Sequence, residues 1–157
     1  MKNYLGIEFG STRIKSVIIN EKFEIISSSY YGWNNKLVNG FWSYSEKEIF
    51  KGLRYACENA LDKYEEKFGR IPDISCIGIS GMMHGYLVLD ENDELLTEFR
   101  TWRNTNTSQA AKELSEKLNF NMPLRWSCSH LYQAILKKEE HVDRITRHLS
   151  IKRCVTR

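Results

Sequence analysis

The chain has 157 residues and a formal net charge of +3, with 41% hydrophobic and 27% charged residues. A chain of this size and composition buries a real core, which excludes a largely disordered or collagen-like protein. The apolar runs are too short for a transmembrane helix, and Glu8 interrupts the N-terminus before a signal-peptide core can form. We therefore expect a cytoplasmic protein with no membrane partner.

The first part of the chain predicts a β-meander followed by a helix. Three segments rich in β-branched and aromatic residues are separated by short polar turns. They cover residues 4–9, 13–19 and 23–31. After a polar loop at 34–40, Ser45 and Glu48 have the spacing of a helix capping box. Apolar residues then recur every three or four positions up to Phe68, and Gly69 is a natural C-terminal stop.

The second part predicts a strand pair and then helices. Residues 74–80, Ile-Ser-Cys-Ile-Gly-Ile-Ser, predict a buried strand. A strand at 86–89, a return strand at 95–96 and helices at 108–118, 127–137 and 139–145 follow. Strands and helices in this order predict an α/β architecture with a mixed sheet and flanking helices.

The spacing of the four cysteines and four histidines predicts neither a disulfide framework nor a zinc site. Residues 137–157 hold seven basic and three acidic residues. Such a stretch is typical of a nucleic-acid-binding patch or, more often, of a solvated helix with a frayed end. A nucleic-acid partner therefore stays an alternative that we do not expect.

The first strand ends in Glu8-Phe9-Gly10-Ser11-Thr12, and a second strand begins at once. A glycine turn lets the backbone approach an anion, and Ser11 and Thr12 add hydroxyl donors. Glu8 can hold Mg²⁺ directly or through water, and Lys15 or Arg13 adds positive charge. The segment therefore predicts a phosphate site, with an ordinary polar hairpin as the alternative.

Two later segments have the composition of a sugar site. Met83-His84-Gly85 follows the strand at 74–80, and ligands collect at strand ends in α/β sheets. Trp102, near Asn104, offers a flat apolar face beside amide and guanidinium donors. The alternatives are a core histidine beside a turn, and a polar loop that caps the next helix.

Together these three segments resemble, in order and spacing, the N-terminal part of the FGGY carbohydrate kinases, and Met83-His84-Gly85 favours the xylulokinase-like branch. The resemblance covers residues 1–147 and leaves 148–157 as an unmatched basic tail. It implies a ribonuclease-H-like (actin-like ATPase) fold, here as an incomplete domain. It also implies transfer of the γ-phosphoryl group of MgATP to a hydroxyl of a sugar or polyol, with a xylulose-like substrate favoured.

Carried over by resemblance, two sets of residues form the site. Those facing ATP and Mg²⁺ are Glu8, Gly10, Ser11, Thr12 and Lys15, with Glu8 near the metal. Those facing the sugar are Met83, His84, Trp102 and Asn104. Glu8 stands where the family usually has Asp, Met82 where it has Gln, and Asn104 where it has Asp.

Family members are about three times longer, and the resemblance implies a catalytic aspartate beyond residue 157. We therefore expect an N-terminal fragment of a carbohydrate kinase that is inactive as this chain alone. A non-catalytic module that binds a sugar or a protein is the alternative. Because a domain cut within its sheet exposes a strand edge, we also expect homo-oligomers or aggregation.

Overall fold

The computed structural model describes residues 2–155, which form two compact units. Unit 1 comprises the residues up to Asn34 together with Lys47–Met82. Unit 2 comprises Asn35–Glu46 and the residues from Met83 onward. Among the described residues, no helix has the length and apolar character needed to cross a membrane.

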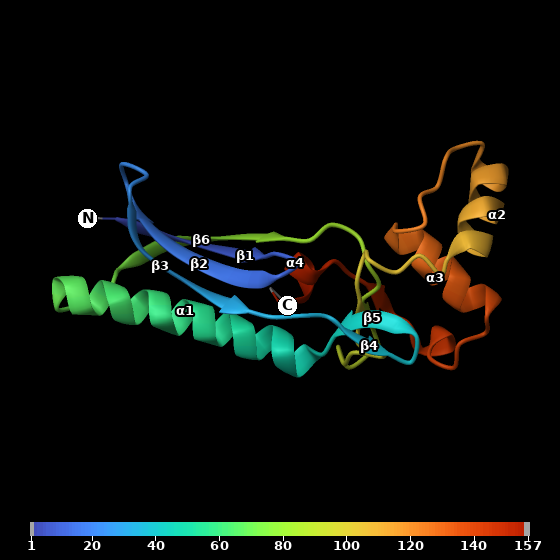
Figure 1. The fold of residues 1–157 in the computed structure, drawn as a ribbon, viewed down its shortest axis with the longest axis horizontal. Helices are drawn as coiled ribbons and strands as arrows, with labels where there is room; N and C mark the ends of the chain where they lie inside the picture. The colour runs from blue at the N-terminus through green and yellow to red at the C-terminus, as the bar shows by residue number, and fades with distance from the viewer. Residues whose placement is uncertain (1, 156–157) are drawn as a thin grey trace. The chain divides into compact units, whose positions relative to one another are not determined.

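Unit 1 is a four-stranded mixed sheet covered on one face by a long helix. The strand order is β3-β2-β1-β6, in which β1, β2 and β3 are antiparallel neighbours and β6 runs parallel to β1. The strands are β1 (Asn3–Phe9), β2 (Arg13–Asn20), β3 (Ile25–Gly32) and β6 (Ile74–Gly81). Figure 1 shows α1 (Glu46–Phe68) running along this sheet. The predicted meander and the predicted helix after Ser45 are confirmed.

The core of unit 1 lies between α1 and one face of the sheet. Alternate residues of β1 and β2 are buried, as expected for strands with one covered face. The buried residues of α1 recur every three or four positions: Ile49, Gly52, Ala56, Ala60 and Tyr64. A Cβ atom at Gly52 would lie 2.6 Å from the Tyr31 ring and 2.7 Å from Ile14, so this glycine permits the close approach of helix and sheet.

Strand β6 is present where the sequence predicts a strand, but the prediction that it is buried is wrong. It is an edge strand that pairs with β1, and most of its residues are exposed. The side chain of Ile77 is 57% exposed. An apolar run signals a strand without saying which faces of that strand are covered.

Unit 2 combines short strands with helices. Its strands are β4 (Lys36–Val38), β5 (Phe41–Tyr44), β7 (Val88–Leu89), β8 (Phe99–Arg100) and β9 (Arg147–His148). Its helices are α2 (Ser108–Leu118), α3 (Ser127–Leu136), the 3-10 helix η1 (Val142–Arg144) and α4 (Ile151–Cys154). The sheet order is β4-β5-β8, with β7 paired to β9. The predicted helices at 108–118 and 127–137 are confirmed.

Three predictions for unit 2 need correction. The helix expected at 139–145 is only the 3-10 turn η1, because Lys138 takes a left-handed conformation (φ 52°) just after α3. The expected loop at 34–40 contains β4, and the expected return strand at 95–96 is a single bridge between Leu89 and Leu95. The short helix α4 buries Ile151 and Cys154, and an unmatched tail over 148–157 stays a prediction.

Candidate functional site

The predicted phosphate loop is the turn between β1 and β2 in unit 1. The N–H of Gly10 donates to the carbonyl of Arg13 at 3.0 Å, and the carbonyl of Gly10 accepts from the indole N–H of Trp33 at 2.8 Å. The N–H of Trp33 donates to the carbonyl of Thr12 at 3.1 Å. A buried tryptophan therefore fixes the turn. The Gly10 N–H serves the turn itself, while Ser11 and Thr12 are exposed.

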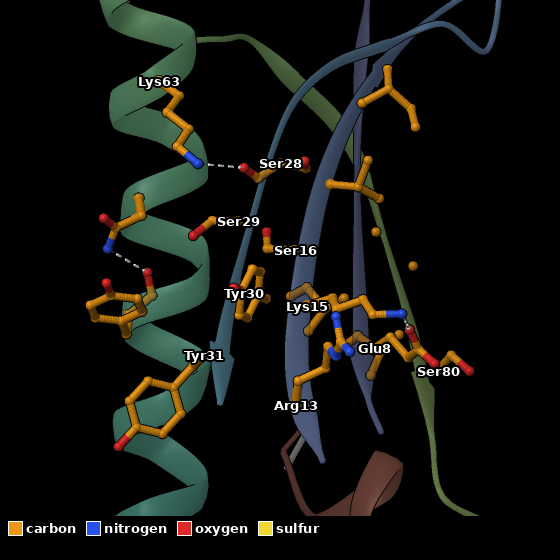
Figure 2. A pocket seen from close by; sticks show the side chains of 18 of the residues that line it. Glu8, Arg13, Lys15, Ser16, Ser28, Ser29, Tyr30, Tyr31, Lys63 and Ser80 are labelled. Atoms are coloured by element: carbon orange, nitrogen blue, oxygen red, sulfur yellow. Dashed lines mark hydrogen bonds and ion pairs between the residues drawn. The ribbon is translucent and has the colours of Figure 1, made fainter. Parts of the chain in front are cut away.

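Glu8 and Lys15 lie opposite one another on β1 and β2. The register pairs Glu8 with Lys15 on one side and with Ser80 on the other, and pairs Lys15 with Tyr30. The Glu8 Oε2 and Lys15 Nζ atoms are 3.0 Å apart, and both side chains are half-exposed. Figure 2 shows the two side chains pointing toward one another beside Arg13 and Ser80. The structure therefore brings the predicted carboxylate and the predicted lysine together.

These side chains line an open groove of about 1240 Å³ in unit 1. The charged residues among those lining it are Glu8, Arg13, Lys15 and Lys63. Three cations against one carboxylate make the groove attractive to anions. Three tyrosines, Tyr30, Tyr31 and Tyr55, add aromatic surface to the groove. The Lys63 ammonium donates to the Ser28 carbonyl (Figure 2). Gly10, Ser11 and Thr12 are not among the described residues that line this groove.

The predicted sugar segments lie in unit 2, where backbone contacts join them. His84 and Gly85 have positive φ angles of 65° and 101°. A Cβ atom at Gly85 would lie 2.7 Å from the carbonyl oxygen of Arg100, so the position requires glycine. Tyr86 and Arg100 exchange two backbone hydrogen bonds of 2.8 and 3.1 Å. Because this bridge is antiparallel, His84 and Trp102 each lie two residues beyond it on adjacent segments.

One stacked ring pair and one cation–π pair occupy this part of unit 2. The imidazole of His84 stacks on the indole of Trp126, with centroids 5.5 Å apart and planes 14° apart. The guanidinium of Arg125 lies 5.4 Å from the centroid of the Trp102 ring. Met83, also predicted to face the sugar, is 77% exposed. The structure therefore brings His84 and Trp102 to two adjacent residues, Arg125 and Trp126.

Asn104 is a buried scaffold residue in the structure. Its Nδ2 donates to the carbonyls of Trp42 and Thr101, both at 2.9 Å, and its Oδ1 accepts from the Trp42 N–H at 2.8 Å. Only 3% of the residue is exposed. A sugar contact by Asn104 stays a prediction, since its amide hydrogens are used to tie the Trp102 loop to β5.

Tyr86 is also the centre of a buried polar cluster. Its hydroxyl is 2.7 Å from His141 Nε2, and its ring contacts those of His130, His141 and His148 at centroid distances of 5.5 to 6.5 Å. Burial raises the pKa of Tyr86 to about 12. Burial, together with the charge of Arg100 and the neighbouring His148, lowers the pKa of His130 to about 4. Under neutral conditions the cluster is therefore uncharged at these two residues.

Arg125, Trp126 and Trp33 were not predicted as site residues from the sequence. Arg125 and Trp126 carry the same signal that identified Trp102, an aromatic ring beside a guanidinium group, but they lie in the break after Pro123. Trp33 has no local signal, because its contacts to Gly10 and Thr12 depend on the pairing of β2 with β3. Among residues 2–155, no group of three or more His, Cys, Asp or Glu side chains is arranged to hold a metal ion.

Comparison with known proteins gives consistent relatives. Residues 3–127 match the family model described as the N-terminal domain of the FGGY family of carbohydrate kinases. The xylulose kinase of Staphylococcus xylosus is 24% identical over 126 residues, or 80% of this chain and 25% of that protein. The gluconokinase of Bacillus subtilis is 30% identical over 118 residues, or 73% of this chain and 22% of that protein.

Solved structures agree at the level of the fold. The xylulose kinase of Rhodospirillum rubrum has a TM-score of 0.88 at 10% identity and covers 98% of this chain and 33% of its own. The glycerol kinase of Plasmodium falciparum, solved with ADP, has a TM-score of 0.77 at 19% identity and covers 89% of this chain and 30% of its own. These likenesses confirm the predicted actin-like ATPase fold.

The chain spans about a quarter of the length of the curated relatives that it matches and about a third of the solved chains. The structural likeness reaches beyond residue 127, where the family model ends, and takes in most of the segment from 148 onward. The sequence match and the fold together show that this chain belongs to the FGGY family of carbohydrate kinases.

Proposed function

We propose that this chain supplies the N-terminal part of an ATP-dependent carbohydrate kinase. The observation that carries the proposal is the cationic groove at the end of β1, where Glu8 faces Lys15 at 3.0 Å. Phosphoryl transfer relies on positioned charges around the phosphates more than on covalent chemistry. The groove offers such charges in Arg13, Lys15 and Lys63.

Glu8 fits a role beside Mg²⁺ bound to the nucleotide. Mg²⁺ is usually held by one or two carboxylates together with substrate phosphates and waters. Among the described residues that line this groove, Glu8 is the one with a carboxylate. The metal, when bound, neutralises charge on the transferred phosphoryl group. Lys15 holds the Glu8 carboxylate toward the groove, while Gly10, Ser11 and Thr12 form the adjoining turn that Trp33 fixes.

The sugar or polyol is proposed to bind in unit 2. His84 offers ring nitrogens to hydroxyl groups, and the Trp102 face suits the apolar C–H face of a sugar. Met83 adds an exposed apolar wall, and Asn104 supports the loop that carries Trp102. The relatives are named as xylulose kinases and gluconokinases, so the substrate class that they favour is a five-carbon sugar or a six-carbon sugar acid.

A chimera tests the proposal directly. Residues 1–147 replace the matching part of the Bacillus subtilis gluconokinase, and phosphorylation of gluconate is measured after circular dichroism has confirmed folding. We expect an active chimera in which Glu8→Ala lowers kcat by about 100-fold or more, whereas Glu8→Asp retains most of the rate. Normal turnover by the Glu8→Ala chimera, or a folded chimera without activity, would contradict the proposal. The 157-residue chain alone is expected to show negligible turnover.

A further inference from the structure

The two residues just before α3 link both predicted sugar segments. Arg125 lies over the ring of Trp102 at 5.4 Å, and the next residue, Trp126, stacks on His84 at 5.5 Å. His84 and Trp102 also flank the same antiparallel bridge between Tyr86 and Arg100. Four side chains from three segments of unit 2 therefore gather in one place.

Trp126 is itself held in position. Its N–H donates to the carbonyl of Pro123 at 3.2 Å, and its carbonyl accepts from the N–H of His130 at 3.1 Å. Its ring also packs against Phe120, with centroids 6.1 Å apart. A fixed indole face under the His84 imidazole limits rotation of that ring. Of the residues that the structure describes, none forms a hydrogen bond with the ring nitrogens of His84, so both remain available to a ligand.

The side chain of Arg125 is exposed and carries a positive charge. No carboxylate of residues 2–155 lies within 4.0 Å of its guanidinium group. The nearby Arg103 is engaged elsewhere, since its guanidinium lies 3.8 Å from the Trp42 ring centroid and bonds to Asn35 at 3.1 Å. Of these two arginines beside Trp102, Arg125 is therefore the one whose guanidinium group is available to an anionic ligand.

We propose that Arg125 and Trp126 complete the sugar subsite and make it selective for a polyol that carries a carboxylate. Trp126 is a positioning residue that holds His84 toward the hydroxyl groups. Arg125 binds the carboxylate, since a guanidinium fork matches two carboxylate oxygens and forms charge-assisted hydrogen bonds. The inference rests on the proposed function, because it takes His84 and Trp102 as the sugar-facing residues.

The test uses the ¹⁵N-labelled 157-residue chain and two ligands that differ at one carbon. D-gluconate carries a carboxylate where D-glucitol carries a CH₂OH group. At equal ionic strength, we expect gluconate to shift the Trp102 and Trp126 indole signals with a dissociation constant about tenfold lower than that of glucitol.

Variants separate the two roles. Arg125→Met should remove the preference for gluconate and leave glucitol binding unchanged, while Lys112→Met, on the exposed face of α2, should leave both unchanged. Trp126→Ala should shift the His84 imidazole signals of the free protein and weaken both ligands. Trp126→Phe should restore most of this loss, because a phenyl ring can still stack.

The outcomes are distinguishable. Equal affinity for gluconate and glucitol, or a preference that survives Arg125→Met, overturns the carboxylate selectivity and leaves the proposed kinase function standing. If the His84 signals of the free protein do not change in Trp126→Ala, the proposed positioning role of Trp126 is wrong. If neither ligand shifts the signals of His84 and Trp102, both the inference and the proposed sugar site are wrong, whereas the Glu8 chimera still reports on phosphoryl transfer.

Discussion

Asn104 lies at a position where the family usually has an aspartate, but its side chain is buried and bonds to backbone groups. The resemblance implies a sugar-facing acidic residue at this position, but the asparagine uses both amide hydrogens on backbone carbonyls. The sequence places Asn104 two residues after Trp102, and its contact with the sugar stays a prediction. It gave no sign of the hydrogen bonds to Trp42, because these depend on the pairing of β5 with β8.

Replacing Asn104 by the acidic residue usual in the family should destabilise unit 2. The Asn104→Asp carboxylate cannot donate to the carbonyls of Trp42 and Thr101, and it stays buried beside them. We expect a loss of about 3 kcal/mol in the free energy of unfolding at pH 7, measured by urea denaturation. Asn106→Asp, at an exposed position in the same loop, serves as the control and should change stability by less than about 0.5 kcal/mol. Equal stability of the two variants would contradict the assigned role of Asn104.

Gly85 combines a left-handed backbone with close neighbours. Its φ angle is 101°, and a Cβ atom there would lie 2.7 Å from both the Arg100 carbonyl oxygen and the Phe99 ring. Gly85→Ala should therefore cost about 3 kcal/mol of stability and shift His84 signals, since the clash acts on backbone. Gly40→Ala tests the strain alone, because Gly40 also has a positive φ but no atom within 4 Å; its cost should be about 1 kcal/mol. Similar costs at both positions would show that the close contact at Gly85 is unimportant.

At the scale of elements, the sequence predicted long periodic segments well and short ones poorly. The helix α1 has a repeating apolar face over 23 residues, and both its existence and its start after Ser45 were predicted. Strands β4, β5 and β8 have two to four residues each, too few to show a period. The pairing of β5 with β8 also joins residues more than 50 positions apart, as between Ser43 and Arg100, which no local pattern encodes.

The sequence predicts strand β6 but not that it lies exposed at the edge of the sheet. Its residues include no charge and no proline, the features that usually protect an edge strand from pairing with another chain. We expect the 157-residue chain to self-associate through this edge, and Ile77→Lys to shift its sedimentation toward monomer. Ile71 is 70% exposed and lies outside β6, so Ile71→Lys provides the matched control and should not change association. A wild-type chain that stays monomeric at high concentration would contradict this prediction.

At the scale of the whole molecule, the two units differ in their ionisable groups. All four histidines lie in unit 2, three of them around Tyr86, whereas unit 1 has none. Arg100 and Glu139 also face this cluster and pair with one another at 2.5 Å. As the pH falls, unit 2 should therefore lose stability before unit 1 does.

His130 decides whether stability rises or falls with pH. Its pKa is about 4 in the folded chain and 6.5 in the unfolded chain. Between these values the unfolded chain binds more protons than the folded one, so stability falls as the pH drops from about 6.5 to about 4. The loss from His130 should reach about 3 kcal/mol near pH 4. His130→Leu should flatten this dependence.

Thiol labelling measures the two units separately. Cys154 is buried in unit 2, and Cys57 is partly buried in unit 1. Between pH 6.5 and 4, labelling of Cys154 should accelerate more than labelling of Cys57 when both rates are compared with those of the denatured chain. Parallel acceleration of both thiols, or a steep pH dependence that survives in His130→Leu, would show that the histidine cluster does not set the acid limit.

In the proposed function, the groove of Glu8 and Lys15 forms the phosphate side of an FGGY kinase. The most direct test is a chemical-shift map of the ¹⁵N-labelled chain during titration with MgATP. We expect saturable shifts confined to the groove and the β1–β2 turn, residues 8–15, that disappear in Glu8→Ala. Shifts elsewhere in the chain with none in this region, or an unchanged map in Glu8→Ala, would contradict it.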